Sequence, residues 1–209
     1  MKTLASNPTP AKAFTLIELL VVMGIIGVLA AMTVGLSTVA SRSSKTSRMQ
    51  KDLREIETCI ENYKSSLGSY PRDNPTPNGP SPLYYELRGT YFDQGYFTLA
   101  GETNRIGAGF LTDVFNVPTL DNAARAGDEP KFKYDSFKPD QHKKIAVGSV
   151  TVDILVAPLP GPDSIKATDG SLANPWHYDK TSFTRHNKAS FDLWAEINLG
   201  SSTTQIHNW

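Results

Sequence analysis

Residues 13–22 read Ala-Phe-Thr-Leu-Ile-Glu-Leu-Leu-Val-Val and open the only continuous apolar run in the chain. From Leu19 to Leu36 the one polar side chain is that of Thr33. As a helix rising about 1.5 Å per residue, this run covers roughly 27 Å, close to the hydrocarbon thickness of a bilayer. A soluble core helix usually keeps a polar stripe, and this run has none. The sequence therefore predicts a membrane span over residues 19–36.

Glu18 lies at the head of this apolar run. A carboxylate inside a membrane segment is unfavourable unless it has a partner, so such residues are candidate functional residues. One interpretation is a contact made in assembly. The other is an acid in the first helical turn, where the positive end of the helix favours it. The residues alone leave both interpretations open.

The net charge and the cysteine content of the chain limit the classes of function to consider. The 21 Lys and Arg residues balance 21 Asp and Glu residues, so the net charge gives no reason to expect a nucleic-acid partner. Cys59 is the one cysteine, which excludes an intramolecular disulfide framework and argues against a Cys-based metal site. We expect it to be a small buried hydrophobic residue.

Residues 13–22 strongly resemble the class III signal of type IV pilins and type II secretion pseudopilins. The resemblance implies that a prepilin peptidase cuts between Ala13 and Phe14 and that the new amino group of Phe14 is methylated. Residues 1–13 would be the leader peptide. Glu18, fifth in the processed chain, would be the assembly contact that pairs with the Phe14 amine of a neighbouring subunit. The family usually has Gly before the cut, so Ala13 implies slower or family-specific processing.

Two features oppose the simplest form of this interpretation. Small residues follow the span near Ala40 and Ser41, so cleavage of an ordinary secretory signal there is the alternative. More positively charged residues follow the span than precede it. This distribution favours a cytoplasmic location for the part of the chain after the span. The residues concerned are Lys2 and Lys12 before the span, and Arg42, Lys45, Arg48, Lys51 and Arg54 after it. The resemblance implies the opposite orientation, with the leader inside and the domain outside.

An apolar stripe continues the helix beyond the span. Its members are Met49, Leu53, Ile56, Ile60, Tyr63 and Leu67. Gaps of three and four residues place them on one helical face, and Gly68 supplies a C-terminal stop. One helix is therefore predicted from about Phe14 to Leu67, with residues 14–40 as its transmembrane and assembly half. Gly35, where many family members have Pro, is the expected point of helix flexibility.

Residues 41–209, which include the second half of the helix, are predicted to form a globular domain of the α+β class, and the resemblance implies that this domain lies in the periplasm. The proline-rich residues 69–82 indicate a loop, and a short helix is expected over residues 83–87. Alternating apolar residues predict strands at 150–156, 132–134 and 191–199. A second short helix is expected near 111–115, with no other element assigned in 90–129. The expected architecture is pilin-like, with the long helix packed on a small C-terminal antiparallel sheet.

The C-terminal part resembles the major pseudopilin, the G subunit of type II secretion. The matching segments are residues 174–178, 191–194 and 206–209. In that subunit, acidic residues after the last strand bind calcium. Residues 200–204 here have no carboxylate, so we expect that site to be absent or replaced by hydrogen bonds. The insertion between about Arg72 and Val150 is atypical of this subunit.

No catalytic residue, metal site or cofactor is predicted. The histidines, at positions 142, 177, 186 and 207, have no helix-spaced ligand pair. Trp176, Tyr178 and Trp194 suit packing in the core or at its rim better than a recognition surface.

The resemblance implies a structural subunit of a type II secretion pseudopilus in the bacterial inner membrane. Its partners would be other copies in a helical filament, prepilin peptidase, the assembly platform protein and ATPase, minor pseudopilins and inner-membrane lipid. The alternatives are a type IV pilus subunit, or a membrane-tethered binding module or enzyme that uses the 72–150 insertion.

Overall fold

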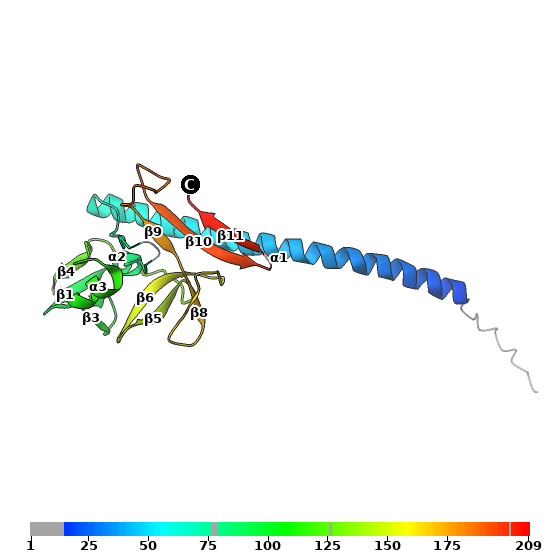
Figure 1. Cartoon of the computed structure of the whole chain (residues 1–209), viewed down its shortest axis with the longest axis horizontal. Helices are drawn as coiled ribbons and strands as arrows, with labels where there is room; N and C mark the ends of the chain where they lie inside the picture. Colours follow the sequence, from blue (N-terminus) through cyan, green and yellow to red (C-terminus); the bar gives the residue numbers. More distant parts are fainter. Residues whose placement is uncertain (1–14, 77–78, 126, 201) are drawn as a thin grey trace, which may run out of the picture. The chain divides into compact units, whose positions relative to one another are not determined.

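The computed structural model describes residues 15–76, 79–125, 127–200 and 202–209, apart from the side chains of residues 32–38. The chain divides into two compact units, residues 1–44 and residues 45–209. Three helices are present in the described part: α1 (Leu16–Leu67), α2 (Leu83–Arg88) and α3 (Ala108–Phe115) (Figure 1). The helices predicted near 83–87 and 111–115 are therefore confirmed.

Helix α1 ends where the sequence predicts. Gly68 follows it at φ +82° and its N–H donates to the Lys64 carbonyl at 2.7 Å. Glycine adopts this left-handed conformation without the steric penalty of a side chain, which ends the helix at Leu67. Within the described residues, no helix is both long enough and apolar enough to cross a membrane. The predicted span at 19–36 runs into residues whose side chains lie outside the described part.

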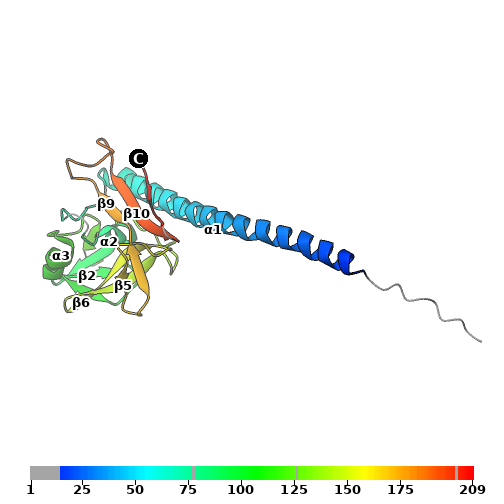
Figure 2. The same ribbon diagram turned by 45° about the vertical axis from the view of Figure 1, so that its right-hand side comes forward.

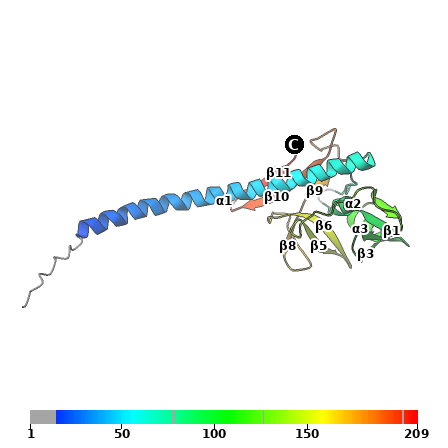
Figure 3. The same ribbon diagram turned by 180° about the vertical axis from the view of Figure 1, so that it is seen from behind.

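The second part of α1 supplies one side of the core of residues 45–209. Met49, Ile56, Ile60 and Tyr63 are fully or almost fully buried, as the apolar stripe predicts. This part of the helix lies beside β9 (His177–Asp179) and β10 (Asp192–Leu199), as Figures 1 and 2 show and as Figure 3 shows from behind.

The described residues form three separate sheets, whereas a single small antiparallel sheet was predicted. The first has the order β3-β2-β1-β4, the second β5-β6-β8-β7 and the third β11-β10-β9. The strands of the first sheet are β1 (Thr90–Asp93), β2 (Tyr96–Leu99), β3 (Arg105–Gly107) and β4 (Ala123–Arg125). Those of the second are β5 (His142–Val147), β6 (Val150–Ala157), β7 (Ile165–Lys166) and β8 (Leu172–Pro175), and the third adds β11 (Ser202–His207) to β9 and β10. The pair β1–β4 is parallel, so the domain is mixed and not purely antiparallel.

Two predicted strands are confirmed and one is wrong. Strands β6 and β10 occupy the predicted positions. Residues 132–134 form no strand because their backbone bonds to other groups: Phe132 N–H donates to Asn122 Oδ1 at 3.2 Å, and Tyr134 N–H donates to the Leu87 carbonyl at 2.9 Å. The alternation of apolar and polar residues at 132–134 therefore belongs to a half-buried segment that is not paired with a strand in the described part of the chain.

Glu86 on α2 joins three parts of the domain. Its side chain is fully buried, and its carboxylate accepts three hydrogen bonds. Tyr63 on α1 donates through its hydroxyl at 2.8 Å, and the backbone N–H groups of Asp121 and Asn122 donate at 2.8 and 2.9 Å. Burial raises the pKa of Glu86, and the hydrogen bonds oppose that rise.

Cys59 is 2% exposed, which confirms the expected buried position. Burial, with a smaller effect from Glu55, raises the pKa of its thiol to about 12. Because the thiolate is the reactive form, we expect native protein to react with iodoacetamide at pH 8 at least about a hundredfold more slowly than protein unfolded in urea. Labelling followed by mass spectrometry measures this, and equal rates would contradict the buried position.

Candidate assembly site

A reciprocal pair of hydrogen bonds between Thr15 and Glu18 closes the first turn of α1. Glu18 N–H donates to Thr15 Oγ1 at 3.3 Å, and Thr15 N–H donates to Glu18 Oε2 at 2.9 Å. The Thr15 hydroxyl also donates to Glu18 Oε2, at 2.9 Å. This is a capping box, which satisfies backbone donors that the helix itself leaves unpaired. It also places the negative charge at the positive end of the helix.

The capping box gives Glu18 a role within its own chain, as the helix-start interpretation predicts. Its spacing, a Thr followed three residues later by a Glu, is a recognisable helix-start signal that would have identified Thr15 from the sequence. Glu18 is also exposed, so a group from another molecule can reach the carboxylate. The assembly contact stays a prediction.

Apolar side chains surround this cap and are exposed all along residues 16–31. Leu16, Ile17 and Leu20 are 85%, 70% and 68% exposed. A contiguous apolar surface of this kind is unfavourable in water and marks a region covered by lipid or by other helices. Gly24 and Gly27 have nothing within 4 Å of the position where a Cβ would lie, so another backbone can approach closely there.

Among the described residues, no other predicted site residue lies beside the Thr15–Glu18 cap. Ala13 and Phe14 lie outside the described residues, and so do the surroundings of Gly35, which falls within the bounds of α1. Beside the loop after β10, which was compared above with the calcium-binding loop of the major pseudopilin, Ser202 Oγ donates a hydrogen bond to the Leu199 carbonyl at 3.2 Å. In the part of the chain that the structure describes, no group of three or more His, Cys, Asp or Glu residues could hold a metal ion.

Histidine–carboxylate pairs are a feature that the sequence did not reveal. His177 Nε2 lies 3.2 Å from Asp163 Oδ2, and His186 Nδ1 lies 3.1 Å from Asp192 Oδ2. Burial lowers the pKa of His177, against the opposing effect of Asp163. These pairs come from separate loops and strands, so no local spacing could indicate them.

The aromatic residues 176, 178 and 194 divide into two groups. Trp176 and Tyr178 are buried in the core, as expected, whereas Trp194 is only half-buried. The first two occupy the core and Trp194 lies at its rim, in agreement with the predicted core or rim packing.

A capped helix whose first turns expose apolar side chains around a single carboxylate is typical of a subunit that assembles through that helix. A comparison with protein families matches residues 9–34 to the prokaryotic N-terminal methylation motif. The motif supports a type IV pilin-like or pseudopilin subunit, a class of structural proteins that prepilin peptidase processes and that polymerise into filaments. Neither the comparison with curated proteins nor the comparison with solved structures finds a match.

Proposed function

We propose that this protein is a structural subunit of a type II secretion pseudopilus. Prepilin peptidase cleaves it between Ala13 and Phe14, Phe14 is N-methylated, and α1 anchors it in the inner membrane with residues 41–209 in the periplasm. The main support for this proposal is the start of α1. It is capped by Thr15 and Glu18, exposes apolar side chains and lies within the methylation motif.

Assembly then uses an exchange of partners at Glu18. In the isolated chain the carboxylate is satisfied by Thr15. Cleavage creates a positive amine at Phe14, and a neighbouring subunit's amine pairs with Glu18 when the exposed apolar turns pack together. Because this contact lies away from water, the charge on Glu18 requires an opposite charge beside it. The platform protein and ATPase add subunits at the base, Gly35 lets the helix bend, and minor pseudopilins complete the filament.

The secretion role is preferred over a surface pilus for two reasons. The C-terminal segments resemble the major pseudopilin, and Cys59, the one cysteine, cannot form the C-terminal disulfide common in major pilus subunits. A surface pilus for adhesion, motility or DNA uptake is the second candidate.

Mass spectrometry of the protein extracted from membranes tests the processing step. We expect a chain that begins with N-methylated Phe14. An intact Met1, or a new N-terminus near Ala40, would contradict both filament roles.

Deletion of the gene separates the two filament roles. We expect the culture supernatant to lose an exported protein while twitching motility and surface filaments are unchanged. Loss of surface filaments with normal export would select the pilus role instead.

A further inference from the structure

A row of aromatic rings crosses the outer face of the third sheet. Trp194 on β10 pairs in register with His177 on β9 and with His207 on β11, so these side chains share one face. The opposite face of β10 is in the core, where Leu193 and Ile197 are fully buried. The row therefore lies on the side of the sheet away from the core.

The rings stack on one another. His177 lies nearly parallel to Trp194, with centroids 5.2 Å apart. Trp209 contacts Trp194 edge-on and lies nearly parallel to His207 and to His186, with centroids 4.4 and 4.2 Å away. Mutual stacking fixes the orientations of these rings, which we call the aromatic platform. Trp194 and Trp209 are half-buried and His186 and His207 are exposed, whereas His177 at the end of the row is buried.

The loop beside this platform is held in place by Arg185 within the loop and by Asp192 at the start of β10. The Arg185 guanidinium donates to the backbone carbonyls of Ser182, Asn187 and Lys188. The buried Asp192 carboxylate accepts from the backbone N–H groups of His186 and Asn187, at 2.6 and 2.9 Å. A site formed on this loop is therefore largely organised before a ligand arrives, which lowers the entropic penalty of binding.

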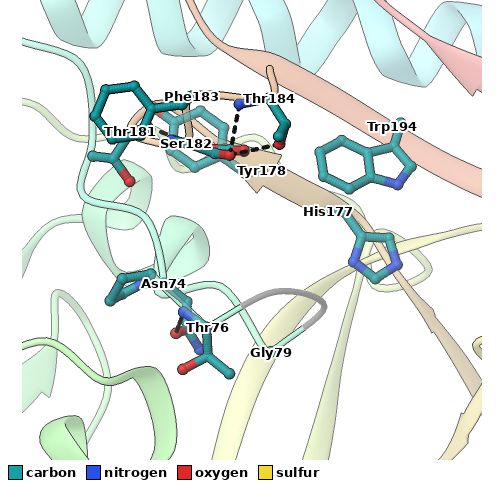
Figure 4. A pocket seen from close by; sticks show the side chains of 12 residues that line it. Asn74, Thr76, Gly79, His177, Tyr178, Thr181, Ser182, Phe183, Thr184 and Trp194 are labelled. Atoms are coloured by element: carbon teal, nitrogen blue, oxygen red, sulfur yellow. Dashed lines mark hydrogen bonds between the residues drawn. The ribbon is translucent and has the colours of Figure 1, made fainter. Parts of the chain in front are cut away.

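Two cavities share Trp194, Asp179 and Thr184 in their linings, with volumes of about 460 and 240 Å³. Figure 4 shows the larger one, where Ser182 and Thr184 lie side by side and the rings of His177 and Trp194 form another part of the wall. Phe183, in the lining of the larger cavity, is 97% exposed.

Uncommitted polar groups complete the lining. Asp179 accepts from Thr181 and Ser182 N–H groups through Oδ1 only, and within the described residues its Oδ2 has no hydrogen-bond partner. The Gln205 side-chain amide in the smaller cavity is likewise without a partner in the described part of the chain. A carboxylate oxygen, an amide and hydroxyls together offer both donors and acceptors.

We propose that this outer-face site, formed by Trp194, Trp209, Phe183, Asp179, Thr184 and Gln205, binds an uncharged oligosaccharide. A sugar ring has an apolar C–H face that stacks on a flat aromatic ring, and its hydroxyls need donors and acceptors around the rim. Nucleic acid fits poorly, because phosphate recognition needs available cations. Here Lys180 and Lys188 donate to the carbonyls of Tyr70 and Phe183, Arg185 is committed to the loop, and Asp179 adds negative charge.

Tryptophan fluorescence of the full chain tests the proposal, in a detergent without a sugar headgroup. The probes are cellotetraose, chitotetraose and maltotetraose at millimolar concentration. Trp194 and Trp209 report from the site, while buried Trp176 supplies a constant background. We expect a saturable change with at least one probe, and the absence of a response to all three would overturn the proposal.

Variants separate the site from general effects. Trp194→Ala should weaken binding about tenfold or more, as loss of an aromatic anchor does. Gln205→Ala and Phe183→Ala change exposed side chains, so they keep the fold and should weaken binding as well. Phe92→Ala changes a partly exposed aromatic residue on the first sheet and should leave binding unchanged. Binding that survives both Gln205→Ala and Phe183→Ala, or that is lost equally in Phe92→Ala, would contradict the assigned site. Neither outcome depends on filament assembly.

Discussion

Replacing Glu86 with alanine is expected to lower the free energy of unfolding by about 3 kcal/mol or more, because two buried donors and one partly buried donor would lose their acceptor. These are the Tyr63 hydroxyl and the backbone N–H groups of Asp121 and Asn122. Each unsatisfied buried donor costs roughly 1–3 kcal/mol, and removal of a buried charge offsets part of the sum. Urea unfolding followed by circular dichroism measures the change.

Two further variants show whether the acceptor or the charge matters. In Glu86→Gln, one carboxylate oxygen becomes an NH₂ group that faces a backbone N–H, so about 1–3 kcal/mol should still be lost. Glu129→Ala is the matched control: Glu129 also accepts from a tyrosine hydroxyl, that of Tyr91 at 3.0 Å, but on the surface. We expect its effect to stay within about 0.5 kcal/mol. Equal effects of Glu86→Ala and Glu129→Ala would refute the role of the buried acceptor.

The pH dependence of the Glu86→Gln penalty has a defined sign. Burial raises the folded-state pKa of Glu86 above its usual value, so the folded state holds this proton more tightly than the unfolded state. The stabilising contribution is fully present below the unfolded pKa and is lost as pH rises through the raised pKa. The penalty of Glu86→Gln should therefore be largest at acidic pH and become smaller as pH rises. A penalty that grows with pH would contradict the raised pKa.

Local periodicity explains what the sequence could predict. The stripe from Met49 to Leu67 repeats every three or four residues, and the alternation in β10 repeats every two. Each pattern indicates which face of one helix or strand is buried, and it can be recognised without knowing what that element packs against. The same holds for Gly68, whose effect on the end of α1 is local.

Features set by distant partners were missed. The β1–β2 hairpin turns at Gln94 and Gly95, both with positive φ, and Gln94 is not a residue that signals such a turn. The alternation at 132–134 predicted a strand because the sequence does not reveal that Asn122 bonds its backbone. The outer-face site likewise depends on the register of three strands, which brings His177 and His207 to Trp194.

Replacing Glu18 should abolish assembly while leaving residues 45–209 folded. We expect Glu18→Ala to reach the membrane and lose its leader but to be absent from filaments. An unpaired amine of Phe14 in a water-poor contact would destabilise each subunit interface by about 3 kcal/mol or more, roughly a hundredfold in affinity. Cross-linking in membranes and electron microscopy of filaments measure assembly, and the N-terminal mass shows whether processing has occurred.

Glu18→Gln decides between the two roles of this side chain. Glutamine keeps the acceptor oxygen and serves in a capping box as well as glutamate does, so helix α1 should begin at the same residue. It carries no charge, however, and cannot neutralise a neighbouring amine. If pairing with Phe14 drives assembly, Glu18→Gln should fail as completely as Glu18→Ala, while the control Glu129→Gln assembles normally. If Glu18→Gln forms filaments and Glu18→Ala does not, the carboxylate acts through the cap that Thr15 completes, and the assembly contact must lie elsewhere on the exposed apolar turns.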